Sequence, residues 1–344
     1  MSSDMTALER TQKSIRGEKV DRLPQFPISL ASTCEIMEVK QRDFSLDPEI
    51  MSDTLIAFRE KVGCDGIYVS RDNWVYHEAL GGELIFPEDD ESYSKKTILD
   101  SVDHYTRLSV PDPWDAPGMK TLLKAAEKTV EAVGDEYYIQ ANIDTGPFSL
   151  GAVLLGAEKF LLDIMTEDKG LIDEFLDFCT EVVIAYGKAM IETGVHGIQF
   201  GDATASLMGP EHFGKFALPW EKKAVDELTG RECDIWIHIC GKTDQFLAML
   251  KELDFHGFEV DAKVPMTTAR DLLGEKIAIK GNLDTTFLLR ETPEAVYSAT
   301  QEMIRSGNFK TGVVVSPGCG VPRMTPLENL VAMQKACEDY TFDN

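Results

Sequence analysis

Eight short runs rich in β-branched and aromatic residues are spread along the chain, mostly with helix-like stretches between them. Runs of this length suit strands, and the intervening stretches carry the three- and four-residue apolar spacing of helices. Strands that alternate with helices form a parallel sheet. Eight such units predict an α/β fold of the (β/α)8 TIM barrel type, with a doubly wound sheet as the competing arrangement. The predicted strands are Pro24–Leu30, Gly66–Ser70, Tyr137–Asp144, Gly197–Asp202, Asp234–Gly241, Gly257–Asp261, Ile277–Asp284 and Gly312–Gly318. Helices are predicted at Asp168–Thr193, Pro210–Thr229, Pro293–Ser306 and Pro326–Tyr340.

The length of the chain suits a single barrel. Its 344 residues predict one domain over residues 1–344, with an N-terminal helical extension ahead of the first strand. Residues 81–118, after the second predicted strand, are polar, acidic and rich in proline. We interpret this segment as an insertion, which is either a solvated excursion or a lid over the barrel mouth.

The charge balance excludes some classes of partner. The chain has 34 basic and 59 acidic residues and a formal net charge of −25. A nucleic-acid binder needs a basic face, and an anionic membrane attracts basic segments, so neither partner is expected. The N-terminal residues show no signal peptide, and the seven cysteines are scattered without the regular spacing of a disulfide framework. These features lead us to expect a protein of the reducing cytoplasm, in which a special cysteine binds metal or acts in catalysis.

Alternation along the strands predicts which side chains face the barrel interior. In Asp234–Cys240, three isoleucines occupy one face, and Trp236, His238 and Cys240 occupy the other. The isoleucine face is expected to pack outward on the helices, so His238 and Cys240 look inward. Polar side chains near the carboxyl ends of strands are typical of the active site of a barrel. The same test places inward Gln140, Asn142, Asp144, Glu259, Asp261, Lys280, Asn282 and Asp284.

His238, Cys240 and Cys319 together predict a metal site. His238 and Cys240 are two residues apart on one strand and so share a face, and Cys319 follows the last predicted strand between two glycines. Three protein ligands with an open fourth position are typical of catalytic zinc. Asp261 is a candidate fourth ligand when substrate is absent, or otherwise a hydrogen-bond acceptor or a partner for Lys280.

The charge of such a site predicts its chemistry. Zn²⁺ with two thiolates and a neutral imidazole is formally neutral, and it deprotonates a substrate thiol that enters the fourth position. The bound sulfur then gains electron density and is a nucleophile at neutral pH, ready to accept an alkyl group.

Several motifs resemble the uroporphyrinogen decarboxylase superfamily, and within it the zinc-dependent corrinoid methyltransferase branch that includes methylcobamide:coenzyme M methyltransferases. The resemblance extends over nearly the whole chain. The H-x-C pair and the late cysteine are the features that resemble the methyltransferases rather than the decarboxylases. The matching motifs are Arg16–Pro24, Glu78–Gly81, Gly146–Phe148, Leu218–Trp220, His238–Gly241, Gly281–Asp284 and Ser316–Gly320.

The resemblance implies a (β/α)8 barrel with zinc at His238, Cys240 and Cys319. It also implies transfer of a methyl group between a corrinoid (methylcobamide, a cobalamin-type cofactor) on a separate protein and an acceptor, usually a zinc-bound thiol such as coenzyme M. The candidates for orienting the acceptor or the corrinoid are Asn142, Asp144, Asp202, Asn282 and Asp72.

Other functions remain open at this point. Relatives use other acceptors such as tetrahydrofolate, or transfer a methyl group from a donor to the corrinoid. A uroporphyrinogen decarboxylase-like lyase is a further alternative, because Asp72 falls where the decarboxylases keep a key aspartate. Against it, Phe26–Thr33 lacks the arginines of that family. A non-catalytic scaffold for a corrinoid protein, with structural zinc, is the last alternative.

Overall fold

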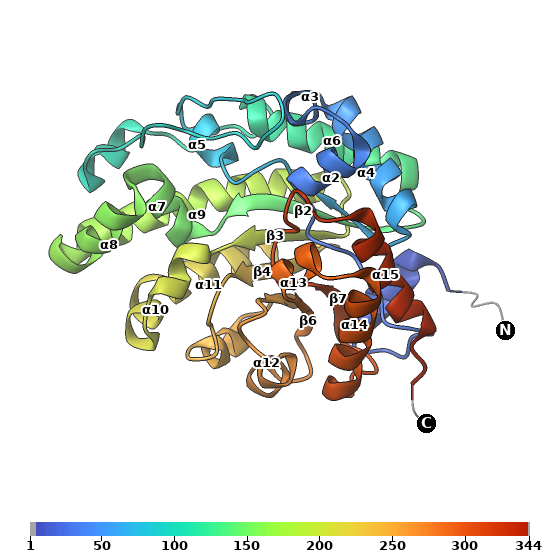
Figure 1. Cartoon of the computed structure of the whole chain (residues 1–344). Helices are drawn as coiled ribbons and strands as arrows, with labels where there is room; N and C mark the ends of the chain where they lie inside the picture. Colours follow the sequence, from blue (N-terminus) through green and yellow to red (C-terminus); the bar gives the residue numbers. More distant parts are fainter. Residues whose placement is uncertain (1–4, 343–344) are drawn as a thin grey trace.

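Seven parallel strands form one sheet in which each strand neighbours the next along the chain (Figure 1). The structure is a computed structural model that describes residues 5–342. This consecutive parallel order is that of a (β/α)8 barrel and differs from the reversed order of a doubly wound sheet. The strands are β1 (Gly66–Val69), β2 (Tyr138–Thr145), β3 (Gly197–Gly201), β4 (Asp234–Ile239), β5 (Gly257–Val260), β6 (Ala278–Leu283) and β7 (Val313–Pro317).

The first predicted strand, Pro24–Leu30, is an extended segment rather than a regular strand. Only Gln25 makes a bridge, to Val315 of β7. The carbonyl of Gln25 accepts the amide of Asp65, just ahead of β1, at 2.7 Å. The segment therefore fills the gap between β7 and β1. Pro24 and Pro27 explain the difference, because proline has no N–H to donate to a ladder.

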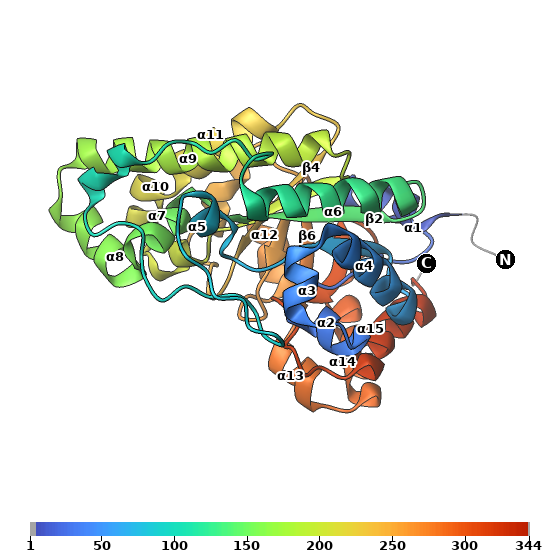
Figure 2. The ribbon, with the colours of Figure 1, turned by 90° about the horizontal axis from the view of Figure 1, so that it is seen from above.

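Helices cover the outside of the sheet. In the view from above, α6 and α9 lie along one side of the barrel, and α14 and α15 lie along the other (Figure 2). Ahead of β1 are α1 (Ala7–Ile15), α2 (Ala31–Met37), α3 (Gln41–Leu46) and α4 (Pro48–Val62). From β1 to β4 the helices are α5 (Val75–Ala79), η1 (Val102–Arg107), α6 (Pro117–Val133), α7 (Pro147–Leu155), α8 (Ala157–Thr166), α9 (Lys169–Glu192), η2 (Ala203–Leu207), α10 (Pro210–Phe216) and α11 (Leu218–Leu228). The remaining helices are η3 (Leu247–Glu252), α12 (Met266–Leu273), α13 (Thr285–Arg290), α14 (Pro293–Gly307) and α15 (Leu327–Asp339).

The barrel interior is polar at its centre. Lys280 of β6 donates to Gln140 of β2 at 2.7 Å and to Glu259 of β5 at 3.0 Å. Because β2 and β6 are not neighbours in the sheet, their side chains meet only across the interior. The ring of Phe26 lies 4.0 Å from the Lys280 ammonium. The inward orientation predicted for Gln140, Glu259 and Lys280 is confirmed.

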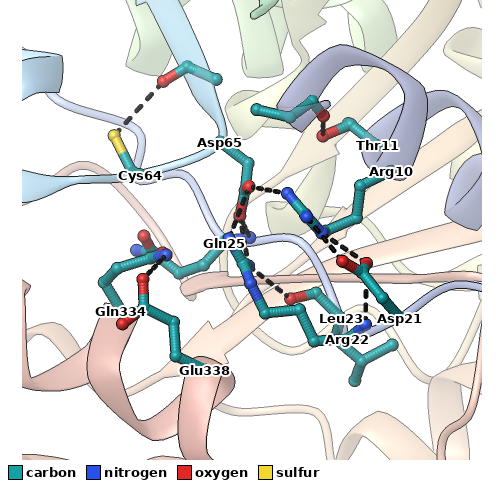
Figure 3. Close-up of polar contacts among 12 residues, drawn as sticks. Arg10, Thr11, Asp21, Arg22, Leu23, Gln25, Cys64, Asp65, Gln334 and Glu338 are labelled. Carbon is teal, nitrogen blue, oxygen red and sulfur yellow. Dashed lines mark hydrogen bonds and ion pairs between the residues drawn. The ribbon is translucent and has the colours of Figure 1, made fainter. Parts of the chain in front are cut away.

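A network of ion pairs joins the N-terminal extension to the base of the barrel (Figure 3). The carboxylate of Asp65, only 1% exposed, accepts from Arg10 at 2.8 Å and from Arg22 at 2.7 and 2.8 Å. Arg10 also pairs with Asp21 at 2.6 Å. The network links α1, the extended segment and β1, which are the parts that close the ring.

The insertion at 81–118 follows β1 and is mostly irregular. It runs along α7, α8 and α9 (Figure 2). The amide of Leu99 donates to the carbonyl of Leu154 in α7, and the ring of Tyr105 lies 5.8 Å from that of Phe178 in α9. The predicted insertion is therefore packed on the helical wall, and its role as a lid stays a prediction.

Candidate metal centre

His238, Cys240 and Cys319 meet at the carboxyl end of the barrel. His238 lies near the end of β4, Cys240 follows that strand, and Cys319 follows β7. Their ligand atoms all lie within 4.8 Å of one another. The structure thus brings together the three side chains that alternation and motif spacing predicted to converge.

Glycine allows the loop after β7 to approach so closely. A Cβ atom on Gly318 would lie 2.5 Å from the backbone nitrogen of Ala262, in the loop after β5. A larger residue would push the two loops apart and move Cys319 away from β4.

The imidazole of His238 is oriented by the neighbouring strand. Its Nδ1 lies 3.1 Å from the carbonyl oxygen of Glu259, and its Nε2 faces the two cysteines. A protonated Nδ1 bonded to a carbonyl leaves Nε2 as the free lone pair, which is the common arrangement of a metal-bound histidine. The Glu259 side chain lies below, held by Lys280 and Gln140.

Electrostatic coupling among the three groups favours a thiolate. The hydrogen bond with Cys240, together with the contact with His238, lowers the pKa of Cys319. The same contact with Cys319, followed by burial, raises the pKa of Cys240. Burial opposes the charged form of His238, but its contacts with Cys319 and Glu259 outweigh this effect and raise its pKa. A cation held among these groups would stabilise both thiolates and the neutral imidazole.

Two of the three distances within the group fit a tetrahedral ion of zinc type. Zn–S bonds near 2.3 Å and Zn–N bonds near 2.0–2.1 Å place ligand atoms about 3.4–3.8 Å apart. Cys240 Sγ lies 3.6 Å from Cys319 Sγ, which lies 3.7 Å from His238 Nε2. The third distance, from His238 Nε2 to Cys240 Sγ, is 2.9 Å, which is a hydrogen-bond length and would have to increase for both atoms to bind one ion. Two sulfurs and one imidazole are a donor set typical of zinc.

A cavity of about 440 Å³ opens beside the three side chains. It has the volume of a small-molecule site, and it lies where barrels hold their substrates. Its lining comprises Ile28, Leu30, Tyr68, Asn73, Trp74, Asn142, Thr145, Ser149, Val153, Gln199, Gly201, Ala203, Thr204, His238, Cys240, Glu259, Cys319 and Gly320. Of the predicted candidates for orienting the acceptor or the corrinoid, Asn142 faces this cavity.

Asp261 and Asn282 hold the loops around the centre. The Asp261 carboxylate accepts from the amide of Gly241 at 2.8 Å and from that of Lys263 at 2.9 Å. Asn282 donates to the carbonyls of Val264 and Asp261 at 2.6 and 3.2 Å. Asp261 lies outside the group of three, and its contact with Gly241 fixes the residue next to Cys240. Its role as a fourth ligand stays a prediction.

The other predicted aspartates bind backbone amides or buried partners. Asp144 was expected to face inward, but it has a φ of 70°, and its carboxylate accepts from the amide of Tyr76 at 2.9 Å. Asp202 accepts from the amide and hydroxyl of Ser149 at 2.7 and 2.6 Å. Asp284, also expected inward, accepts from the amide of Phe287 at the start of α13.

Asp72 lies in a buried ion pair. Its carboxylate is 2.8 Å from the guanidinium of Arg71 and accepts from the hydroxyl of Ser92 at 2.5 Å. It also accepts from the amide of Trp74 at 2.9 Å. These partners occupy both oxygens and hold Asp72 apart from the cavity lining.

Sequence reasoning missed two side chains that line the cavity, Tyr68 and Gln199. They are joined by a hydrogen bond of 2.8 Å from the phenol to the Gln199 carbonyl. The alternation test, applied to Gly197–Gly201, would have found Gln199, because it lies between Ile198 and Phe200.

The chain matches known proteins over almost its full length. The model of the family described as uroporphyrinogen decarboxylase (URO-D) matches residues 6–340. A methylcobamide:CoM methyltransferase of Methanosarcina mazei is 31% identical over 353 residues, which cover 99% of this chain and 100% of the relative. A uroporphyrinogen decarboxylase of Myxococcus xanthus is 25% identical over 256 residues, which are 72% of each chain.

A solved structure shares the fold. A methyltransferase from Methanosarcina mazei superposes with a TM-score of 0.88 at 23% identity, over 98% of this chain and 99% of that one. No helix within residues 5–342 is both long and apolar enough to cross a membrane.

Proposed function

We propose, from the premise that the chain belongs to the uroporphyrinogen decarboxylase family, that it is a zinc-dependent methyltransferase acting with a corrinoid protein. The methyl group would pass from a methylcobamide carried by that partner to a thiol bound in the cavity. The observation that carries the proposal is the convergence of His238, Cys240 and Cys319 beside that cavity. The methyltransferases among the relatives agree with this assignment.

The residues of the centre have distinct tasks. A zinc ion held by His238, Cys240 and Cys319 would supply the Lewis acidity that keeps an acceptor thiol deprotonated at neutral pH. The carbonyl of Glu259 holds the imidazole in the tautomer that offers Nε2. The sulfurs of Cys240 and Cys319 supply negative charge, which raises the nucleophilicity of the incoming sulfur.

The transfer balances without a further reactant. The acceptor thiol loses its proton to solvent, and its sulfur attacks the methyl carbon of the methylcobamide. A carbon–sulfur bond forms as the cobalt–carbon bond breaks, and the bonding pair stays on cobalt. The apolar part of the cavity wall, including Ile28, Leu30 and Val153, excludes water from the sulfur and so preserves its reactivity.

The decarboxylase alternative has less support in the geometry. It would need Asp72 available to a substrate, and the carboxylate of Asp72 is 1% exposed and bonded to Arg71 and Ser92.

Metal analysis combined with a methylcobalamin assay tests the proposal. We expect about one zinc per chain and thiol-dependent loss of methylcobalamin. Cys240→Ala should lower both zinc affinity and rate by more than about 100-fold, because loss of a ligand exceeds the 10- to 100-fold cost of losing an outer partner.

The matched control is Cys233→Ala, a buried cysteine away from the group of three. It should keep its zinc and its rate. Full activity in zinc-depleted protein, or in Cys240→Ala, would contradict the proposed mechanism.

A further inference from the structure

Gln199 presents a fixed hydrogen-bond donor to the cavity beside the metal centre. Its carbonyl Oε1 accepts from the phenol of Tyr68 at 2.8 Å and from the amide of Asn142 at 2.5 Å. With Oε1 held by two donors, Nε2 must point away from both. The side chain is 2% exposed and lines the cavity.

The orientation of these partners is fixed in turn. Asn142 accepts the amide of Asp144 on its Oδ1 at 2.6 Å, so its Nδ2 is the atom that faces Gln199 and Tyr68. Tyr68 accepts from Asn142 at 2.9 Å and donates to Gln199. Taken together, these hydrogen bonds allow only one assignment of donors and acceptors among the three side chains. In that assignment both N–H groups of Gln199 Nε2 lie outside the network.

Within residues 5–342, no hydrogen bond uses Nε2 of Gln199 as its donor. A ligand that fills the cavity shields its wall from water, so a polar group there is stabilised when the ligand satisfies it, and a ligand oxygen would accept this N–H. Thr145, on the same wall, has a buried hydroxyl without a partner. The wall therefore offers neutral hydrogen-bonding groups in addition to its apolar side chains.

The charges around the cavity favour an uncharged ligand. Among the residues that line the cavity, all within residues 5–342, there is no lysine or arginine that could pair with an anionic group. The N-terminus of α7, a feature that commonly holds anions, is already occupied, because Asp202 accepts from the amides of Phe148 and Ser149. A sulfonate or carboxylate would compete with Asp202 for the same amides.

We propose that Gln199 is the residue that selects the methyl acceptor, and that the acceptor is a small uncharged thiol bearing a hydroxyl or carbonyl oxygen. The oxygen accepts from Gln199 Nε2, and the sulfur faces His238, Cys240 and Cys319. This inference rests on the proposed methyl transfer. It distinguishes the acceptor of this chain from coenzyme M, the anionic thiol that appears in the names of its methyltransferase relatives.

Three thiols of similar size test the proposal on the zinc-loaded protein. They are 2-mercaptoethanol, ethanethiol and 2-mercaptoethanesulfonate. We expect the first to bind most tightly by calorimetry and to give the highest kcat/KM with methylcobalamin. Gln199→Leu should lower its affinity and kcat/KM by about 3- to 10-fold, the worth of one neutral hydrogen bond, and leave ethanethiol unchanged.

Two further variants keep the test decisive. Tyr68→Phe removes one of the two hydrogen bonds to Gln199 Oε1, and it should give a smaller loss of affinity and kcat/KM that is confined to 2-mercaptoethanol. This variant also tests the inference if Gln199→Leu fails to fold. Gln301→Leu makes the same change on α14, where Gln301 donates to Tyr297, and should alter neither thiol.

Tightest binding of the sulfonate, or equal losses for 2-mercaptoethanol and ethanethiol, would overturn the inference. Failure of the proposed function has a different signature, because the wild-type protein would then hold no zinc or methylate none of the three thiols. Where the protein holds zinc but methylates no thiol, the calorimetric comparison of 2-mercaptoethanol with ethanethiol still decides whether Gln199 selects the ligand.

Discussion

Lys280 and Glu259 form an ion pair in the interior of the barrel, a region that most barrels fill with aliphatic side chains. Both are at most 1% exposed and lie 3.0 Å apart. Burial lowers the pKa of Lys280, and its contact with Glu259 opposes this effect. Since the backbone of Glu259 also orients His238, the pair supports the floor of the metal centre.

Lys280→Met is expected to destabilise the protein by about 3–5 kcal/mol, because it leaves the Glu259 carboxylate buried without its partner. The double variant Lys280→Met, Glu259→Gln should recover part of this loss, since neither buried charge then remains. Urea unfolding of the single and double variants measures the coupling. Equal stability of the wild type and Lys280→Met would show that the pair contributes nothing.

Aspartates at the carboxyl ends of strands fix helices at the same end of the barrel, on their own or the preceding strand. Asp144 binds the first turn of α5, Asp202 binds that of α7, and Asp284 binds that of α13. A carboxylate at a helix N-terminus satisfies free N–H groups and complements the helix dipole. These aspartates therefore hold the first turns of three helices in place at the carboxyl end of the barrel.

Asp144→Asn tests this arrangement through pH. Burial raises the pKa of Asp144 to about 7, above its unfolded value near 3.9. The folded state then holds a proton that the unfolded state has lost, so this contribution to stability is present below about pH 4 and is lost as pH rises through 7.

We expect the stability of the wild type relative to Asp144→Asn to fall by on the order of 3 kcal/mol between pH 4.5 and pH 8. Urea unfolding across this range measures the difference. The matched control is Asp284→Asn, which changes a strand-end cap at an exposed position. A difference for Asp144→Asn that does not vary with pH would contradict the assignment.

One predicted helix, Pro210–Thr229, is in fact two helices. α10 ends before Ala217, and α11 carries Pro219 in its first turn. A proline inside one continuous helix would remove a hydrogen bond and clash with the preceding turn, whereas the first turn tolerates it. The apolar period continues across the break, and for that reason the pattern alone did not reveal it.

Closure of the barrel depends on contacts that are distant in sequence. The carboxylate of Asp65, just ahead of β1, accepts from Arg10 of α1 and from Arg22, which precedes the extended segment Pro24–Leu30 (Figure 3). It also accepts the amide of Gln25 at 2.9 Å. The extended segment has few ladder hydrogen bonds, so we infer that this network holds it in the ring.

Asp65→Asn is expected to lower the free energy of unfolding by about 3–5 kcal/mol, because Arg10 and Arg22 lose their shared carboxylate inside the protein. Asp226→Asn is the matched control, since Asp226 pairs with Lys222 on an exposed helix face and should cost less than about 0.5 kcal/mol. Urea unfolding of the two variants provides the comparison. Similar losses for both would show that the network does not hold the ring together.

Local patterns in the chain were sufficient for the alternation of strands and helices, for the inward orientation of His238, Glu259 and Lys280, and for the three candidate ligands. These properties follow from the period of a strand and from the chemistry of side chains, both of which are readable in short windows. The family motifs favoured the barrel over the doubly wound sheet, and they led to the hypothesis of methyl transfer.

Tertiary structure alone decided which polar side chains reach the cavity. The meeting of Cys240 with Cys319, 79 residues later, depends on the closed ring, and the turning of Asp144 onto α5 depends on a backbone angle that alternation does not encode. The orientation of the Gln199 amide is fixed only by its hydrogen bonds to Tyr68 and Asn142, which come from two other strands. Such contacts depend on packing between segments, and so no local window contains them.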